Sequence, residues 1–323
     1  MKTEQIRELA LKIKQNVSKV IVGKDEIIDL SLIALITSGH ILLEDVPGMG
    51  KTILAKTLAK SLNCSFKRIQ FTPDLLPSDL TGINYYNQKS CEFQFRPGPI
   101  FSNILLADEI NRATPRTQSS LLECMEERQV TIDGETLKLG KAFMVIATQN
   151  PVETQGTFPL PEAQLDRFLF KISMGYPTND EGIEILKRFI VNNPIEDIKP
   201  VASSDDIMDA QSSYCSVHAS DDILKYILEI IEKTRNHPDI ILGASPRASQ
   251  ALLKACQVYA ILQGRSFIIP DDVKYLVKPV LRHRLIMKSS ILGRNTSSLS
   301  NVLDQIISDT AVPSEEKLSK GFR

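Results

Sequence analysis

The sequence predicts an α/β fold in which a five-stranded parallel sheet is followed by an all-helical domain. Up to about residue 176, short apolar runs alternate with helical patterns, as they do in a parallel sheet wrapped by helices. Beyond that point no strand with a crossover helix recurs, and amphipathic segments are separated by Ser, Asp, Pro and Gly. A composition of 42% hydrophobic and 24% charged residues over 323 residues fits an ordinary globular chain of about two domains.

Each predicted element has a local signal. Short apolar runs, bounded mostly by polar or turn residues, are typical of strands buried on both faces, and they occupy residues 40–43, 66–70, 104–107, 143–148 and 168–172. Apolar residues at helical spacing predict helices over 1–17, over 222–234 behind Ser220, over 246–263 behind Ser245, and from Pro270. We therefore expect an α/β domain at 1–177, a helical domain at 178–312 and a polar tail at 313–323.

Two segments interrupt the α/β alternation. Residues 129–139 alternate apolar and polar side chains around Asp133-Gly134, which is a strong short-range signal for a β-hairpin. Residues 83–95 contain four aromatic side chains and a turn-forming stretch at 87–90. We expect hairpins near 83–95 and 129–139, standing outside the parallel sheet.

Charge and cysteine content exclude several classes of protein. The net charge of −1 gives no electrostatic reason to expect nucleic-acid or membrane-surface binding. Five scattered cysteines without a Cys-x-x-Cys pair argue against a disulfide framework and a zinc site, and the four histidines have no metal-ligand spacing. The N-terminus lacks the apolar core of a signal peptide, and the longest uncharged stretch, 30–43, is shorter than the roughly 18–20 residues of a membrane span. We expect a cytoplasmic protein without a membrane segment.

A phosphate-binding loop is predicted directly after the first strand. The stretch Asp45–Thr52, DVPGMGKT, lies between that strand and a helical pattern, which is the context such a loop requires. Gly48 and Gly50 let successive N–H groups converge on an anion, Lys51 reaches the β and γ phosphates, and the hydroxyl of Thr52 ligates magnesium. Asp45 replaces the usual first glycine, and we expect the loop to survive because aspartate tolerates left-handed backbone angles. The alternative is a glycine turn before an ordinary helix.

Two acids follow the apolar run at 104–107. Asp108 and Glu109 come at the carboxyl end of a predicted strand, which is where open α/β sheets bind ligands. Asp108 would hold magnesium through its water shell, and Glu109 would orient or deprotonate the attacking water. The alternative is that paired acids merely end a strand.

Five motifs together resemble the MoxR family of AAA+ ATPases, and they occupy residues 48–52, 108–113, 147–151, 165–168 and 243–247. They occur in the order of the family, and the similarity covers nearly the whole chain. The resemblance implies a P-loop AAA+ core with an all-helical lid, ATP and Mg²⁺ as cofactors, and a ring commonly of six subunits. It also identifies the segments at 83–95 and 129–139 with the helix-2 and pre-sensor insertions of this group.

The resemblance assigns roles to further residues. Asn150 would polarise the attacking water or bind the γ-phosphate, Arg167 would be an arginine finger entering the neighbouring subunit's site, and Arg247 would reach the γ-phosphate from the lid of the same chain. An arginine at a helix N-terminus is unfavourable unless an anion offsets the helix dipole, which supports the role of Arg247. The residues assigned to the nucleotide are Val22, Gly23, Val46, Pro47, Gly48, Met49, Gly50, Lys51, Thr52, Ile53 and Asp108.

For six residues near these motifs a structural reading stays open. Asn150 is also a polar turn residue before a proline, and Arg167 has Asp166 and Glu162 nearby in the sequence as salt-bridge partners. Val22 and Gly23 equally suit a turn between helices. Arg112 and Arg116 serve either a subunit interface or a solvated face.

The implied function is magnesium-dependent ATP hydrolysis at the subunit interfaces of a hexameric ring, which remodels or activates a partner protein. Relatives often act with a protein that carries a von Willebrand factor A domain. The alternatives are a nucleotide-gated scaffold without turnover and a DNA-acting AAA+ motor. The intact set of Glu109, Asn150 and Arg167 argues against a scaffold, and the near-neutral charge argues against a DNA motor.

Overall fold

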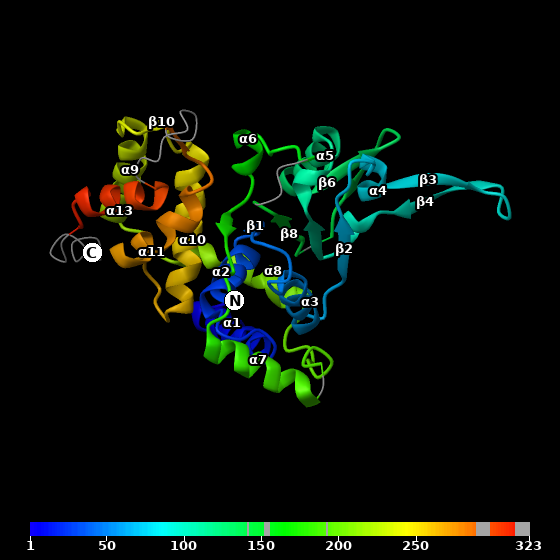
Figure 1. The fold of residues 1–323 in the computed structure, drawn as a ribbon, viewed down its shortest axis with the longest axis horizontal. Helices are drawn as coiled ribbons and strands as arrows, with labels where there is room; N and C mark the ends of the chain where they lie inside the picture. The colour runs from blue at the N-terminus through cyan, green and yellow to red at the C-terminus, as the bar shows by residue number, and fades with distance from the viewer. Residues whose placement is uncertain (141, 152–155, 192, 289–297, 314–323) are drawn as a thin grey trace.

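A computed structural model describes residues 1–140, 142–151, 156–191, 193–288 and 298–313 (Figure 1). Its central sheet has five parallel strands in the order β2-β5-β8-β1-β9. They are β1 (Ile41–Glu44), β2 (Phe66–Gln70), β5 (Ile104–Asp108), β8 (Met144–Gln149) and β9 (Phe170–Ile172). The parallel sheet is confirmed, and each strand lies within two residues of its predicted bounds.

Side chains along each strand point alternately into two apolar layers. In β1, Ile41 and Leu43 belong to one buried cluster and Leu42 to the other. The first layer contains α1 (Thr3–Ser18), α2 (Asp25–Ile36) and α3 (Lys51–Ser61), and the second contains α4 (Pro77–Thr81) and α5 (Pro115–Glu127). Burial on both faces explains why the inner strands are continuous apolar runs, whereas the edge strand β2 exposes polar side chains.

Both segments with hairpin character form antiparallel hairpins. Strands β3 (Gly82–Asn87) and β4 (Glu92–Pro97) pair with each other, as do β6 (Gln129–Ile132) and β7 (Glu135–Lys138). The β3–β4 hairpin extends far from the sheet (Figure 1). Asn84 Nδ2 donates to Asp133 Oδ2 at 2.7 Å, so the base of the long hairpin is tied to the turn of the short one.

The C-terminal part of the chain is helical, as predicted. Its helices are α7 (Asn179–Val191), α8 (Ser204–Ser213), α9 (Asp221–Asn236), α10 (Pro246–Leu262), α11 (Pro270–Leu281) and α13 (Leu299–Asp309). The hydroxyls of Ser220 and Ser245 cap α9 and α10. One antiparallel pair is added, between β10 (Ile240–Leu242) and β11 (Ile286–Met287), which are too short to show a periodic pattern. The predicted tail lies outside the described residues from residue 314 onward.

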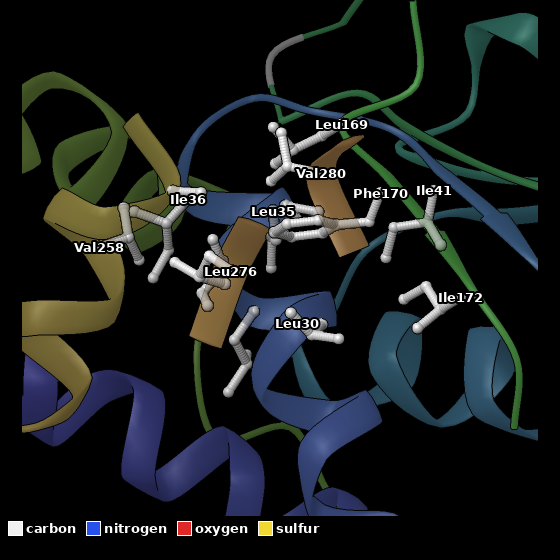
Figure 2. Packing of buried hydrophobic residues seen from close by; sticks show 14 of the residues in the cluster. Leu30, Leu35, Ile36, Ile41, Leu169, Phe170, Ile172, Val258, Leu276 and Val280 are labelled. Atoms are coloured by element: carbon white, nitrogen blue, oxygen red, sulfur yellow. The ribbon is translucent and has the colours of Figure 1, made fainter. Parts of the chain in front are cut away.

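One apolar cluster joins the sheet to the C-terminal helices. Figure 2 shows the side chains of Leu35 from α2, Phe170 from β9 and Val280 from α11 lying close together. Because these side chains are almost fully buried, the helical part is packed against the sheet and its position is fixed by the core. None of the described helices has the length and apolar character needed to cross a membrane.

Candidate nucleotide-binding site

The loop between β1 and α3 has the conformation that an anion site requires. Gly48 and Gly50 have φ angles of +86° and +84°, which L side chains rarely adopt. A Cβ atom at Gly48 would meet nothing within 4 Å, so the backbone conformation, and not a lack of space, calls for glycine. Gly50 is also the N-cap of α3 and offers no side-chain oxygen to the first N–H groups of that helix. These N–H groups are therefore available to a phosphate.

Asp45 is used differently from our expectation. Its φ angle is not among the positive ones, so tolerance of left-handed angles is the wrong explanation for an aspartate at this position. The buried carboxylate instead accepts hydrogen bonds from Ser173 Oγ at 2.6 Å, from the backbone N–H of Met174 at 2.7 Å and from that of Gly175 at 3.2 Å. Asp45 thus ties the start of the loop to the segment that leaves β9.

A cavity of about 350 Å³ opens beside the loop, at the carboxyl ends of the strands. Its volume lies within the range of small-molecule sites. The predicted residues that line it are Pro47, Gly48, Met49, Gly50, Lys51, Thr52, Ile53, Asp108, Glu109 and Asn150. Lys51 Nζ donates to the carbonyl oxygens of Asp45 at 2.8 Å and Val46 at 3.4 Å, which holds the ammonium over the loop. The structure therefore brings together the loop, both acids and Asn150.

The side chain of Asp108 is held from two neighbouring strands. Its Oδ1 accepts a hydrogen bond from Thr148 Oγ1 of β8 at 2.5 Å. Its Oδ2 accepts from Arg68 of β2, at 2.7 Å from Nη2 and 3.1 Å from Nε. The pairing of β5 with both β2 and β8 makes this possible. Arg68 lies two residues before Gln70, the register partner of Asp108, so Arg68 and Asp108 share a face of the sheet.

Glu109 is also held by neighbours, and its backbone is strained. Its φ angle of +55° lies in the left-handed region, and its N–H donates to Thr148 Oγ1 at 2.8 Å. Its Oε2 lies 2.7 Å from both Gln70 Nε2 and Arg112 Nε. Arg112 therefore pairs with a site acid, whereas Arg116 is exposed. The carboxylate is aimed into the cavity but is already paired there.

A second, more apolar cavity of about 180 Å³ adjoins the first and shares Gly48, Met49, Gly50 and Ile53 with it. Val22 lines this cavity together with Ile185 and Phe189 of α7. Gly23 lies next to it with φ +67°, and a Cβ there would come within 1.9 Å of Glu181 Oε1, so glycine permits the close approach of α7. An apolar slot continuous with a polar cavity suits a base joined to phosphates.

Arg167 and Arg247 lie at the opposite end of the sheet. They line a third cavity of about 320 Å³, which shares no residue with the cavity of Lys51. Arg167 comes just before β9, at the amino ends of the strands, and the four residues of β1 alone separate the two ends by roughly 13 Å. In this structure Arg247 does not line the cavity of Lys51 in its own chain, because the lid helix α10 packs near the amino end of the sheet.

Glu126 of α5 holds both arginines. Arg167 Nε lies 3.2 Å from Glu126 Oε2, and Arg247 Nη2 lies 2.5 Å from Oε1 of the same carboxylate. Arg167 Nη1 also donates to the carbonyl oxygen of Leu122 at 2.6 Å. Asp166, an alternative partner for Arg167, pairs instead with Arg284. The two guanidinium groups therefore lie side by side around one acid.

Thr52 and Asp108 suit a magnesium ion that is shared with a substrate. Both line the phosphate cavity, and they supply the hydroxyl and carboxylate oxygens that Mg²⁺ prefers. The described residues contain no group of three His, Cys, Asp or Glu side chains that could hold a metal alone. Since Mg²⁺ in such sites is usually bound by one or two carboxylates, waters and substrate phosphates, the donor set fits.

Sequence reasoning missed Arg68, Gln70, Thr148 and Glu126. The alternation of Arg68 and Gln70 near the end of a strand was a usable signal, because polar residues two apart lie on the same face. Their partners depend on which strand lies beside β2, which no local pattern shows. Glu126 gave no signal, since one more acid in a charged helix is ordinary.

The chain matches two family models, and they agree with this geometry. The model described as ATPase family associated with various cellular activities (AAA) matches residues 40–170, and the AAA lid domain matches residues 232–301. The fold and the cavity beside the glycine loop thus define an AAA ATPase core followed by its lid.

Individual relatives narrow the class. The chain is 54% identical to the uncharacterized protein YeaC of Bacillus subtilis over 88% of this chain and 89% of that protein. It is 40% identical to the chaperone MoxR1 of Mycobacterium tuberculosis over 92% of this chain and 80% of that protein. A crystal structure from Cytophaga hutchinsonii matches with a TM-score of 0.90 and 38% identity over 97% of both chains. The chain belongs to the MoxR family of AAA+ ATPases.

Proposed function

We propose that this protein hydrolyses ATP with Mg²⁺ at the contacts between subunits of a ring. The observation that carries the proposal is the separation of two sets of groups. Lys51, Asp108 and Glu109 share one cavity, whereas Arg167 and Arg247 lie at the other end of the sheet. A chain built in this way needs a second copy to bring its arginines to a phosphate.

Each residue of the cavity has a task that follows from its place. The N–H groups of the loop and the ammonium of Lys51 bind the phosphates, and the apolar slot beside Val22 takes the base. A magnesium ion held by Thr52 and Asp108 would supply positive charge at the phosphates. Glu109 takes the proton of the attacking water after leaving its partners Gln70 and Arg112, and Asn150 orients that water.

Arg167 and Arg247 act on the ATP of the neighbouring subunit. A planar guanidinium group binds two phosphate oxygens at once and stabilises the negative charge that develops on them. Glu126 keeps both groups side by side, so the two arrive together. A finger of this kind raises turnover by roughly 10³–10⁵ in GTPases.

The work done with ATP is the remodelling or activation of a partner protein. The name of the relative MoxR1 as a chaperone supports this, and so does the long β3–β4 hairpin, which extends from the core with Tyr86 and Phe93 exposed. We propose a hexameric ring in the cytoplasm, a client presented together with a von Willebrand factor A domain protein, and no role for nucleic acid or membrane.

Mixing two inactive variants tests the proposal. Subunits with Glu109→Gln lack the base and subunits with Arg167→Ala lack the finger, but a mixed ring contains contacts where an intact Glu109 faces an intact Arg167. We expect each variant alone to release almost no phosphate and the mixture to regain hydrolysis.

The matched control mixes Arg167→Ala with the double variant Glu109→Gln/Arg167→Ala, which has no complete contact and should stay inactive. No recovery in mixed rings whose assembly has been verified would contradict action between subunits. Normal phosphate release by Glu109→Gln alone would contradict the role of Glu109.

A further inference from the structure

Arg68 stands out in the phosphate cavity because it pairs with the acid assigned to magnesium. It belongs to the edge strand β2, and its guanidinium directs both Nη2, at 2.7 Å, and Nε, at 3.1 Å, to the same oxygen of Asp108, Oδ2. The side chain is 48% exposed, so it is not locked in place by packing. It can therefore change partner without disturbing the core.

The second observation is the charge of the cavity. Among the described residues that line it, Lys51 and Arg68 are the basic ones. Glu109 is already balanced by Arg112 at 2.7 Å. The groups left to face a triphosphate are thus the ammonium above the loop and the guanidinium at the edge of the sheet.

Asp108 cannot serve Arg68 and a hydrated magnesium ion equally. A carboxylate oxygen has two lone pairs, and the two N–H groups of Arg68 use both of those on Oδ2. The other oxygen, Oδ1, already accepts from Thr148 at 2.5 Å. One lone pair of Oδ1 is left, so a hydrated dication that needs more than one acceptor on Asp108 competes with the guanidinium for Oδ2.

The position of Arg68 selects the phosphate that it would meet. The loop and the first residues of α3 line the cavity, and Arg68 enters it beside Asp108. In the proposed function, Asp108 and Glu109 mark the place where the bond to the last phosphate is broken. A guanidinium binds phosphate oxygens bidentately and is more weakly hydrated than an ammonium. The released side chain therefore has a partner within the same cavity.

We propose that Arg68 is a nucleotide-binding residue that exchanges Asp108 for the terminal phosphate when Mg²⁺-ATP binds. This inference rests on the proposed function and adds a basis for choosing a triphosphate over a diphosphate. ADP lacks the γ-phosphate that completes the exchange, so Arg68 keeps its pair with Asp108 and opposes the metal there.

The test measures the affinity for Mg²⁺-ATP and Mg²⁺-ADP in full-length protein carrying Glu109→Gln, so that ATP persists during the titration. We expect the parent to bind ATP more tightly than ADP. Arg68→Ala should weaken the affinity for ATP about 10- to 100-fold and change the affinity for ADP less than about threefold. Arg68→Lys keeps the charge but loses the planar fork, and should recover only part of the preference. Lys67→Ala, the neighbouring exposed residue on the other face of β2, should keep the parental ratio.

The outcomes separate this inference from the proposed function. If the parent binds neither nucleotide, the proposed function fails. If the parent binds ATP no more tightly than ADP, or if Arg68→Ala and Arg68→Lys weaken both nucleotides equally, Arg68 only balances the charge of Asp108 and the exchange is wrong. A preference for ATP that survives both substitutions contradicts it as well.

Discussion

The two ends of the central sheet carry opposite chemistry. At the carboxyl ends, the acids Asp108 and Glu109 have separate basic partners, Arg68 and Arg112, and a glycine loop lies beside them. At the amino ends, one acid, Glu126, serves both Arg167 and Arg247, and no comparable loop is present among the described residues there. The first end has the parts to bind a phosphate chain, whereas the second end has two cations that share a single acid.

Strand direction explains this difference. In a parallel sheet all loops at one end follow strands and all loops at the other precede them, so β1 leads into the glycine loop while the turn before β9 presents Arg167 at the opposite end. Because the sheet holds the two ends roughly 13 Å apart, no side-chain movement brings Arg167 to Lys51 of the same chain. This separation is the basis for proposing that a second copy of the chain completes the site.

The largest effect is expected at the nucleotide end. Lys51→Ala removes the ammonium above the loop and should abolish the stabilisation by ATP, which at a thousandfold excess over the dissociation constant amounts to about 4 kcal/mol. Thermal unfolding with and without Mg²⁺-ATP measures this. Lys56→Ala, an exposed lysine on the same helix, is the control and should keep the full shift. An ATP-dependent shift that persists in Lys51→Ala would place the nucleotide elsewhere.

Most of the fold was predictable because it follows from local patterns. Four of the five strands were short apolar runs, and the serine caps of α9 and α10 marked where those helices begin. The strands β10 and β11 were missed, since two or three residues cannot show a period. Hydrophobic periodicity indicates which face of a segment is buried, but it cannot predict pairs of strands that are only two or three residues long.

The site was predictable only where one segment carries it. The loop at 45–52 and the acids at 108–109 were readable because each stands at the end of a strand. The role of Asp45 was missed because its partners lie about 130 residues away, at Ser173 to Gly175. The distance of Arg247 from the cavity of its own chain was not readable, because its position depends on how the lid packs against the sheet, which is a property of the whole core.

An intermediate effect is expected at the arginine end. Glu126→Gln keeps the shape of the side chain but removes the charge that holds Arg167 and Arg247 together, and the two guanidinium groups then repel each other. We expect ATP hydrolysis to fall about thirtyfold, equivalent to about 2 kcal/mol, because the arginines lose their shared orientation. Steady-state phosphate release measures the fall.

Binding and a neighbouring acid serve as controls for this variant. ATP binding by isolated Glu126→Gln subunits should be unchanged, since Glu126 does not line the cavity of Lys51. Glu127→Gln, the next residue in the same exposed helix end, should hydrolyse ATP normally. A loss of ATP affinity in isolated Glu126→Gln subunits, where no neighbour supplies arginines, would mean that the two ends are coupled within one chain, against the comparison drawn above.

The smallest effect concerns acid stability, and it also belongs to the arginine end. His40 lines the arginine cavity, and burial, aided by nearby Arg128, lowers its pKa to about 3. Its Nδ1 accepts from the N–H of Val145 at 2.9 Å, and its Nε2 lies 3.1 Å from the carbonyl oxygen of Met125, which fixes the proton on Nε2. Burial also lowers the pKa of His283, so two neutral imidazoles support this part of the core.

Below pH 6.5 the unfolded chain binds a proton at His40 that the folded chain does not bind until about pH 3, so stability is lost as the pH falls. From pH 7.5 to 5.5, His40 should account for about 1.4 kcal/mol of the loss in the free energy of unfolding, measured with urea. His40→Asn retains an acceptor for the N–H of Val145 but does not titrate. Its free energy of unfolding should therefore fall by about 1.4 kcal/mol less than that of the parent over the same pH interval. Equal losses in both proteins would show that His40 is protonated without cost, and that the arginine end is no more acid-sensitive than the rest of the fold.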